Sequence, residues 1–594
     1  MLEIVDATSF APAMFRLNQL HFTVAPGFVF VAACLSFGLV GGVMAQDEKP
    51  FGLAKREIWQ NTRLIGTPET PPPYTVEPVY TNQVWHAPMF IAPEPGSDQL
   101  FALLHESNGK PAELVAFRDD PMVEERKVLI ELRGRLAYSF CFDPNYADNG
   151  YIYLFTNLRT DKFDGGKGNR VSRFVVNRQP DLLIDLQSEH VIIEWSSRGH
   201  DGGGIAFGHD GMLYISTGDG TSDSDNWLSG QTLDDLLGSV LRIDIAHTSE
   251  EKPYTVPPDN PFVDLLNARP ELYAYGLRNP WRLTVDSVTG QVWAGNNGQD
   301  LWETVHLIRP GENYGWSVYE GSHPFYLNRK LGPHPLTLPT AEHPHSEARS
   351  ITGGVVYHGA KWPDLRGHFV YGDYNTGKIW GIRHNGEKVV SQREFADTTL
   401  AIVGFATTRS GDLLVVDHGN GFYRFVPQPR VRQTLPFPTR LSETGLFAST
   451  ETHEMRPGVI GYLVIAPGWN DGALAKRWMA VPGEEQVGFN QSRPWTFPNG
   501  TALVQTLSVE QEDHRGLAKR FRVETRVLLR QQNEWVGYSY RWNEAQTNAE
   551  LIPRDGAKAT FRVADAKSPG GFRRQNWVFP SRADCMACHS RAAG

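Results

Sequence analysis

A short unit of turn, apolar strand and turn recurs along the middle of the chain. Clear copies, each leaving its strand through Gly, Asp or Asn, are GHDGMLYISTGDG, SVTGQVWAGNNGQ and RSGDLLVVDHGNG. Between about residues 78 and 427 no long stretch has the 3.6-residue period of an amphipathic helix. Hairpins repeated at roughly 40 to 60 residues per unit predict a radial all-β fold, a propeller of about six blades. A double β-sandwich is the structural alternative.

Composition supports the same class. The chain has 57 Gly, 40 Pro and 16 Trp, with 21% charged residues, which is typical of a turn-rich β protein and predicts few helices. The formal net charge of -10, without a basic stripe, argues against nucleic-acid binding.

The 594 residues exceed what one ordinary hydrophobic core holds, so we expect more than one domain. From about Arg432 the turn-strand repeat gives way to longer alternating segments such as RVETRVLLR and EWVGYSYRWN. We expect a propeller over 78–430 and a smaller, mostly β domain over 431–594, preceded by a segment over 46–77. In the second domain, the aromatic residues expected to serve as core or interface are Trp495, Trp535 and Trp542.

An apolar run near the start precedes an abrupt change to charge at QDEKP. This pattern predicts a secretory signal over 1–45, cleaved after Ala45. The alternative is a membrane anchor, since residues 28–45 are nearly long enough to span a bilayer. Both interpretations place the rest of the chain outside the cytoplasm, in the periplasm or the extracellular space, with membrane contact only if the signal is not cleaved.

The C-terminus carries the segment DCMACHS, in which Cys585 and Cys588 are followed directly by His589. This Cys-x-x-Cys-His spacing predicts a covalently bound haem c, with the two thiols attached to the porphyrin and His589 as an iron ligand. A redox Cys-x-x-Cys pair is the alternative, but it requires a βαβ setting that this region lacks. The chain stops five residues after His589, whereas a cytochrome c fold would continue, which suggests truncation.

The spacing leaves the second axial position of the haem iron open. A sixth ligand would come from a partner or from upstream, or the iron would be five-coordinate. The upstream candidates are Met455, Met479 and His514.

Five further segments occur in a fixed order in the propeller region: RGHDGGGIAFGHDGMLYISTGDG, LLGSVLRID, YGLRNPWRLTVD, NNGQDLWETVHLIRPGENYGW and SITGGVVYHG. Together they resemble the glucose/sorbosone dehydrogenase family. The resemblance implies a six-bladed propeller, some of whose relatives oxidise sugars with pyrroloquinoline quinone (PQQ) and calcium. The region over 435–588 resembles the extracytoplasmic part that adjoins haem motifs in some bacterial multidomain cytochromes.

The family resemblance also implies roles for single residues. His200 in RGHDGGG matches the catalytic base, and Arg278 and Asn279 in GLRNPW match a pair that contacts the quinone. Without the resemblance, His200 could equally cap a turn and Arg278 could brace a loop. The implied calcium ligands, which could otherwise form a solvated polar turn, are Gly298, Gln299, Glu303 and Tyr314.

Other positions depart from the family. Asn375 stands where a lysine for the cofactor carboxylate is expected, so the nearby Lys378 is the candidate cofactor-binding residue, with Arg198 as a further cation. The segment IVGFATTRSG lacks the two arginines that grip the quinone carboxylates. A tricarboxylate cofactor requires such cationic partners.

The interpretation that unites these features is an exported quinohaemoprotein. It would oxidise a sugar or other alcohol group with PQQ and calcium, and pass electrons to the haem and on to an acceptor such as a cytochrome. The alternative of a different class is a non-catalytic propeller that binds a carbohydrate or a protein. A calcium-dependent propeller hydrolase is a third possibility, although it would not use the haem.

Overall fold

The fold is seen in a computed structural model, which describes residues 56–589. The gaps within that range are 61–62, 108, 159–167, 179, 222, 249–251, 420, 430–435, 493 and 513–514. The predicted signal over 1–45 and the candidate ligand His514 lie outside the described residues.

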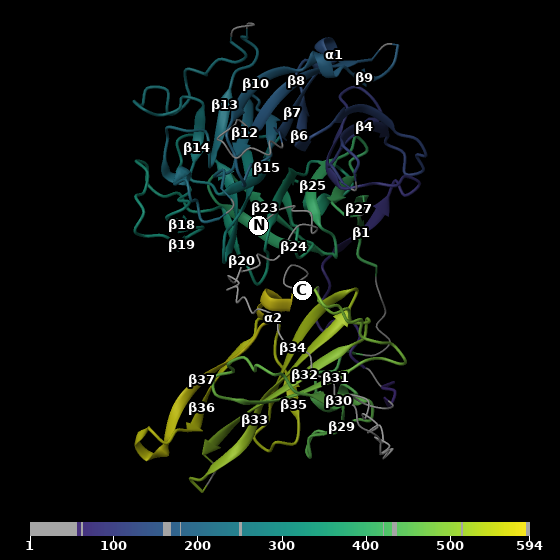
Figure 1. Cartoon of the computed structure of the whole chain (residues 1–594), viewed down its shortest axis with the longest axis vertical. Coiled ribbons are helices and arrows are strands. Elements are labelled where there is room, and N and C mark those ends of the chain that lie inside the picture. The colour runs from purple at the N-terminus through teal and green to yellow at the C-terminus, as the bar shows by residue number, and fades with distance from the viewer. Residues whose placement is uncertain are drawn as a thin grey trace, which may run out of the picture.

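Six four-stranded antiparallel sheets form a six-bladed propeller, as the sequence predicts (Figure 1). Blade 1 is β2 (Pro88–Pro93), β3 (Gln99–Leu104), β4 (Ala112–Arg118) and β5 (Lys127–Leu132). Blade 2 is β6 (Arg135–Phe142), β7 (Tyr151–Leu158), β8 (Asn169–Asn177) and β10 (His190–Trp195), with the short β9 (Leu183–Ile184) beside β8. Blade 3 is β11 (Ile205–Phe207), β12 (Leu213–Thr217), β13 (Ser239–Ile243) and β14 (Leu272–Tyr275).

The other three blades follow the same order from the innermost strand outward. Blade 4 is β15 (Asn279–Val285), β16 (Val292–Asn297), β17 (Trp302–Ile308) and β20 (Ala341–Pro344). Blade 5 is β21 (Ile351–Val356), β22 (Phe369–Asp373), β23 (Lys378–His384) and β24 (Val389–Asp397). Blade 6 is β25 (Ile402–Thr407), β26 (Leu413–Asp417), β27 (Gly421–Pro427) and β1 (Tyr74–Val79).

The propeller closes by pairing its two chain ends in blade 6. β1 runs antiparallel to β27 from Tyr74 opposite Pro427 to Val79 opposite Phe422. The closing strand therefore begins before residue 78, where the sequence places the start of the propeller. This pairing removes a free sheet edge, which is how a closed propeller avoids edge-to-edge aggregation.

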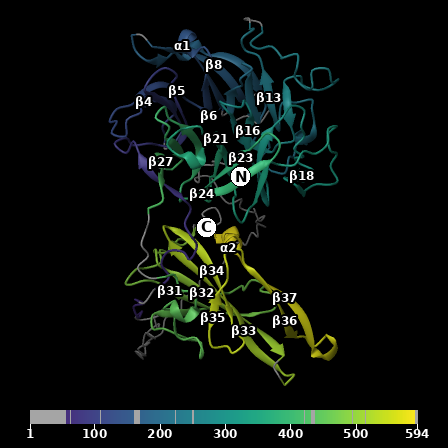
Figure 2. The ribbon, with the colours of Figure 1, turned by 180° about the vertical axis from the view of Figure 1, so that it is seen from behind.

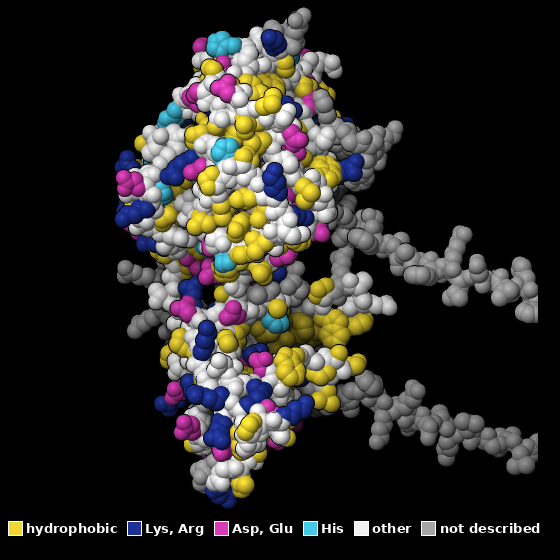
Figure 3. Space-filling model, turned by 90° about the vertical axis from the view of Figure 1, so that its left-hand side faces the viewer, with side chains coloured by type: hydrophobic (Ala, Val, Ile, Leu, Met, Phe, Trp, Pro, Cys, Tyr) yellow, Lys and Arg dark blue, Asp and Glu magenta, His cyan; other side chains and the backbone are white. Residues whose placement is uncertain are grey.

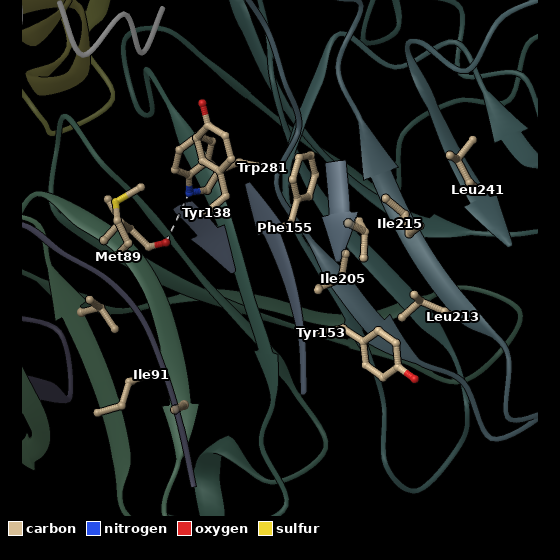
Figure 4. Packing of buried hydrophobic residues seen from close by; sticks show 14 of the residues in the cluster. Met89, Ile91, Tyr138, Tyr153, Phe155, Ile205, Leu213, Ile215, Leu241 and Trp281 are labelled. Carbon is tan, nitrogen blue, oxygen red and sulfur yellow. Dashed lines mark hydrogen bonds between the residues drawn. The ribbon is translucent and has the colours of Figure 1, made fainter. Parts of the chain in front are cut away.

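Burial is greatest in the inner and middle strands of the blades. Every residue of β12 and β26 is buried, whereas in the outermost strand β24 only Phe395 and Ala396 are buried. Inner strands pack between two neighbouring blades, so both of their faces are apolar. Figure 4 shows this packing at Tyr138 and Trp281, whose rings meet edge-on with centroids 5.5 Å apart.

A second body of sheet lies beside the propeller (Figures 1 and 2). Its eight strands are β30 (Val459–Tyr462), β31 (Leu474–Ala480), β32 (Ala502–Glu512), β33 (Ala518–Gln531), β34 (Glu534–Trp542), β35 (Ala549–Leu551), β36 (Ala557–Ala564) and β37 (Phe572–Phe579). Two small hairpin sheets complete the strands: β18 (Tyr319–Glu320) with β19 (His323–Pro324), and β28 (Phe447–Ser449) with β29 (Glu454–Met455). Trp535 and Trp542 are buried in this body, whereas Trp495 is 54% exposed and so is not a core residue.

Helices are few among the described residues, as composition predicts. The two α-helices are α1 (Tyr146–Asn149) and α2 (Arg582–His589), and the single-turn 3₁₀ helices are Leu186–Ser188, Ser229–Gln231, Pro363–Leu365, Leu441–Glu443 and Pro569–Gly571. In the part of the chain that the structure covers, none is long and apolar enough to cross a membrane.

The segment before the propeller packs against the second sheet body. Trp59 is 1% exposed, joins the core of that body with Leu441, and donates a hydrogen bond from its indole to the carbonyl of Gly445. The carbonyl of Gly66 accepts from Gln531 on β33. Seen from the side, a hollow lined by hydrophobic side chains lies between the propeller and this body (Figure 3).

His306 on β17 should make the protein less stable in acid. It is 2% exposed, its Nδ1 has no partner, and burial lowers its pKa to about 3. The ring stays neutral in the folded state, whereas in the unfolded state it is protonated below about pH 6.5. The contribution of His306 to the free energy of unfolding is therefore complete above pH 6.5 and is lost as pH falls toward 3. Between pH 6.5 and 5 this loss is about 2 kcal/mol.

Urea unfolding of His306→Gln and of the parent protein at pH 7 and pH 5 tests this point. The variant should lose about 2 kcal/mol less unfolding free energy between the two pH values. His209→Gln, at an exposed histidine, should behave like the parent. Equal losses in the parent and in His306→Gln would contradict the assignment.

Candidate active site

Four polar residues of blades 3 and 4 meet at one end of the propeller. His200 precedes β11, Asp219 follows β12, Arg278 precedes β15 and Gln299 follows β16. In an antiparallel blade, the innermost strand starts at the same end of the propeller at which the second strand ends. The order of strands along the chain therefore brings these four residues together.

His200 is held as a neutral base. Its Nδ1 lies 2.8 Å from Asp219 Oδ1, and its Nε2 has no hydrogen-bond partner although the side chain is only 6% exposed. Burial lowers the pKa of His200 below its ordinary value, and Arg278 lowers it further, against the opposing effect of Asp219. With Nδ1–H donated to the carboxylate, Nε2 carries the lone pair that can accept a proton.

Asp219 fixes the position of this imidazole, and the sequence did not single it out. Its Oδ1 also accepts from Thr221 N at 3.0 Å, and its Oδ2 accepts from Trp316 Nε1 at 2.8 Å. Its backbone N–H donates to the carbonyl of Arg278. In the sequence Asp219 is one more Asp in a Gly-Asp-Gly strand exit, which predicts only a turn.

Replacing Asp219 by Asn should lower turnover about 10²- to 10³-fold, because the amide no longer selects the base tautomer of His200. Since Asp219 raises the pKa of His200, its loss should also shift the acid limb of the pH-rate profile to lower pH. Steady-state kinetics from pH 5 to 8, with exposed Asp234→Asn as control, measures both effects. An unchanged acid limb would show that Asp219 is only structural.

Arg278 places a guanidinium beside the histidine. It is 1% exposed, its Nε donates to Gln299 Oε1 at 2.9 Å, and its Nη2 has no partner. Its centre lies 5.7 Å from the ring of Trp316. Burial lowers the pKa of Arg278, while the carboxylates of Asp219 and Glu303 act in the opposite direction. A buried guanidinium with an unused N–H is suited to an anionic oxygen.

Asn279, expected to contact the quinone, braces the backbone in this structure. Its Oδ1 accepts from Gly202 N at 3.0 Å and its Nδ2 donates to Asn297 at 3.3 Å. Gly202 has φ +79°, and a Cβ there would lie 2.4 Å from the carbonyl oxygen of Ser216, so this close approach requires glycine. Asn279 thus positions the Gly run that follows His200.

The structure does not bring Gly298, Gln299, Glu303 and Tyr314 together as a calcium site. Glu303 is fully buried, and its two oxygens accept from Gly298 N, His345 Nε2 and Ile351 N at 3.2, 2.9 and 2.8 Å. A calcium ion requires several oxygen atoms that are free to bind it, whereas N–H groups here donate hydrogen bonds to the carboxylate of Glu303.

The turn that follows Gly298 also points backbone N–H groups at a second carboxylate, that of Glu320. The backbone N–H groups of Gln299 and Asp300 donate to Glu320 at 2.5 and 2.6 Å. The Tyr314 hydroxyl bonds within its own blade, to Leu307 O and Glu312. Among the described residues, no group of three or more His, Cys, Asp or Glu is placed to hold a metal ion.

Lys378 is bound elsewhere in the propeller. It begins β23, and its Nζ lies 3.1 Å from Glu394 and 3.9 Å from Asp397 on β24. These acids raise its pKa despite burial. The expected role of Lys378 as a cofactor ligand beside Arg278 therefore has no geometric support.

The haem motif forms α2, with Cys585, Cys588 and His589 at positions i, i+3 and i+4 on one helix face. Cys588 is exposed, and Cys585 packs against Gly537 of β34, where a Cβ would lie 2.5 Å from the sulfur. Burial lowers the pKa of His589, so its imidazole is held neutral, the form that a metal ligand requires. Burial raises the pKa of the Cys585 thiol to about 11, so Cys585 is the less accessible of the two sulfurs.

The chain was compared with known proteins. The profile of the Glucose / Sorbosone dehydrogenase family matches residues 114–422. HIPL2 protein of Arabidopsis thaliana is 28% identical over 374 residues, which are 52% of this chain and 52% of that protein. Hedgehog-interacting protein of Homo sapiens is 30% identical over 298 residues, 47% of this chain and 40% of that protein. Aldose sugar dehydrogenase YliI of Escherichia coli is 25% identical over 290 residues, 47% of this chain and 73% of that protein.

Among solved structures, the PQQ-bound aldose sugar dehydrogenase of Streptomyces coelicolor has a TM-score of 0.47 and 21% identity, over 60% of this chain and all of that chain. The chain spans about half the length of the curated relatives that it matches most extensively. The family profile covers more than half of the 594 residues, including His200, Asp219 and Arg278. The chain belongs to the glucose/sorbosone dehydrogenase family.

Proposed function

We propose that this protein is an exported quinohaemoprotein that oxidises a sugar or other alcohol group at the propeller face around His200. It would work in the periplasm or outside the cell, with a propeller that runs from Tyr74 of β1 to Pro427 of β27 and a haem-bearing unit over 431–594. One observation carries the proposal: His200 Nε2 and Arg278 Nη2, both buried and without partners, meet in one cluster around Asp219. Base and cation are the two groups that such an oxidation needs.

His200 would take the hydroxyl proton of the substrate on Nε2. Asp219 would then face an imidazolium, whose positive charge the carboxylate stabilises through the 2.8 Å contact with Nδ1. Because both side chains are almost fully buried, water would be kept from the transfer and the charge interactions would be stronger than in solution.

Arg278 would hold the anionic cofactor through Nη2 and stabilise negative charge that develops during oxidation. When bound, PQQ would supply a two-electron acceptor for the hydride of the substrate. Calcium is not part of this proposal, because N–H groups and His345 already occupy the carboxylate of Glu303 and Tyr314 bonds elsewhere.

The position of α2 supports electron transfer within the chain. The turn after β22, at Asn375 and Thr376, lies at the same end of the blades as the turns of Asp219 and Gln299. Those two residues line one cavity with Met586, which stands between the two haem cysteines. The haem motif thus faces the propeller end that carries His200. The haem would accept single electrons and pass them to an acceptor such as a cytochrome.

Reconstitution tests the cofactor assignment. Protein purified without quinone should show dye-linked oxidation of an aldose only after PQQ is added, and the PQQ concentration at half-maximal activity should rise for Arg278→Met. No activity with any sugar or alcohol after reconstitution would reject the proposal.

A non-catalytic propeller that binds a carbohydrate or protein is the second candidate. The observation in its favour is that Lys378 is paired with Glu394, which leaves Arg278 as the cation with an unused donor beside His200. This candidate predicts binding of a partner without PQQ and without any turnover.

A further inference from the structure

A cavity of about 470 Å³ lies between blade 5 and the second sheet body. The propeller contributes residues 346–347 and 375–376, the start of β23 and the end of β24, and the other side contributes residues 67–72, the start of β34, residues 554–555 and α2. The residues of the His200 cluster are not among its lining. The volume lies within the usual range of small-molecule sites.

The propeller wall combines an aromatic ring with paired charges. Trp380 on β23 is 5% exposed and packs against His343, with ring centroids 4.5 Å apart and the ring planes tilted by 39°. Lys378 contacts Glu394, and Asp397 is half exposed at the same edge. Glu394 Oε2 accepts both Lys378 and Arg554 at 3.1 Å, while the structure gives Oε1 no protein donor among the described residues. One carboxylate oxygen therefore remains as an acceptor.

The opposite wall repeats this combination. Trp535 on β34 packs against Phe497 with centroids 5.2 Å apart and is 8% exposed. Arg582 of α2 donates through Nη2 to Ile552 O at 3.0 Å, lies 3.2 Å from Glu69, and has no partner for Nη1. Met586 completes this side next to the haem cysteines. Each wall of the cavity therefore carries a tryptophan ring. Arg582 supplies an unused donor on one wall, and Glu394 supplies an unused acceptor on the other.

The wall chemistry selects the class of ligand. Six carboxyl groups and three basic groups line the cavity, so a free anion would meet net negative charge. A neutral polyhydroxyl compound can donate to carboxylates and accept from guanidinium groups, and its C–H faces can lie on tryptophan rings. The volume suits one or two sugar rings.

We propose that the cavity between blade 5 and the second sheet body is a saccharide-binding site, separate from the His200 site. It goes beyond the proposed oxidation and does not depend on it. A bound sugar contacts the propeller through Glu394 and Trp380, and the haem-bearing body through Trp535 and Arg582. A neutral sugar bound in this site therefore bridges the propeller and the second sheet body.

Isothermal titration of the full-length protein with maltose, and separately with the non-reducing sugar trehalose, tests the proposal. Saturable binding of at least one probe is expected. Trp535→Ala and the milder Glu394→Gln should each weaken it at least ~10-fold, which corresponds to about 1.4 kcal/mol. Exposed Trp495→Ala, in the same sheet body, should bind like the parent.

His200→Ala separates this site from the proposed oxidation site, because it should keep the saccharide binding while it loses turnover. Far-ultraviolet circular dichroism confirms that each variant is folded. The proposal is overturned if neither probe binds, if both wall variants bind as the parent does, or if His200→Ala abolishes binding.

Discussion

His200→Ala is expected to reduce dye-linked oxidation by about 10³-fold or more in protein reconstituted with PQQ, since removal of a general base costs about 10²- to 10⁴-fold. The ring contributes Nε2, which has no protein partner, and its loss leaves Asp219 without the group that it orients. The substitution shortens a side chain at the propeller end and leaves the blade strands intact. The measurement is steady-state turnover with an artificial electron acceptor.

His209→Ala is the matched control, because His209 stands in the next hairpin of the same blade and is exposed. It should keep parental turnover. Thermal unfolding should show the same midpoint for His200→Ala as for the parent within a few degrees. If His200→Ala kept the parental turnover, His200 would not be the base and the proposed oxidation would be rejected.

The double substitution Cys585→Ala with Cys588→Ala is expected to abolish covalent haem altogether. Both sulfurs lie on α2, where Cys588 is exposed and Cys585 packs against Gly537 of β34, and the substitutions remove both thioether positions. Haem should extract into acidified acetone from the variant and stay with the parent protein. Dye-linked turnover should remain near the parental value, because these residues are outside the His200 cluster.

Cys141→Ala provides the control for loss of a thiol. Cys141 lies on β6 of the propeller and is unpaired. This variant should keep covalent haem. Haem that remains covalently bound to the double variant, or a parent protein that never binds haem in a host with haem-maturation enzymes, would contradict the assignment of the motif.

The propeller could be predicted from sequence patterns because each of its hairpins is specified by residues that are close together in the chain. Each hairpin carries its own turn residues and apolar strand, so GHDGMLYISTGDG indicates the turn after β11 and the strand β12 without tertiary knowledge. Closure could not be predicted in this way. The pairing of Tyr74 with Pro427, and the packing of Trp59 in the second body, join segments that are far apart in the sequence.

The site was predictable only where a residue type carries its own chemistry. His200 and Arg278 were proposed and do lie together, whereas Asp219 resembles an ordinary turn residue and needs the fold to show its contact with His200. The calcium site stays a prediction: the turn at Gln299 directs backbone N–H groups toward Glu320, an arrangement that the residue types alone do not reveal. The pairing of Lys378 with Glu394 and Asp397 could not be predicted, because these acids lie on the next strand.

The central claim is that a quinone site around His200 supplies electrons to a haem on α2. The most direct measurement is the visible spectrum of the haem-loaded protein, recorded anaerobically before and after addition of PQQ, of a sugar, and of both. We predict reduction of the haem only when PQQ and an oxidisable sugar are present together, and its loss in His200→Ala. A haem that stays oxidised with both present across a panel of sugars and alcohols would contradict the account and leave the propeller as a binding module.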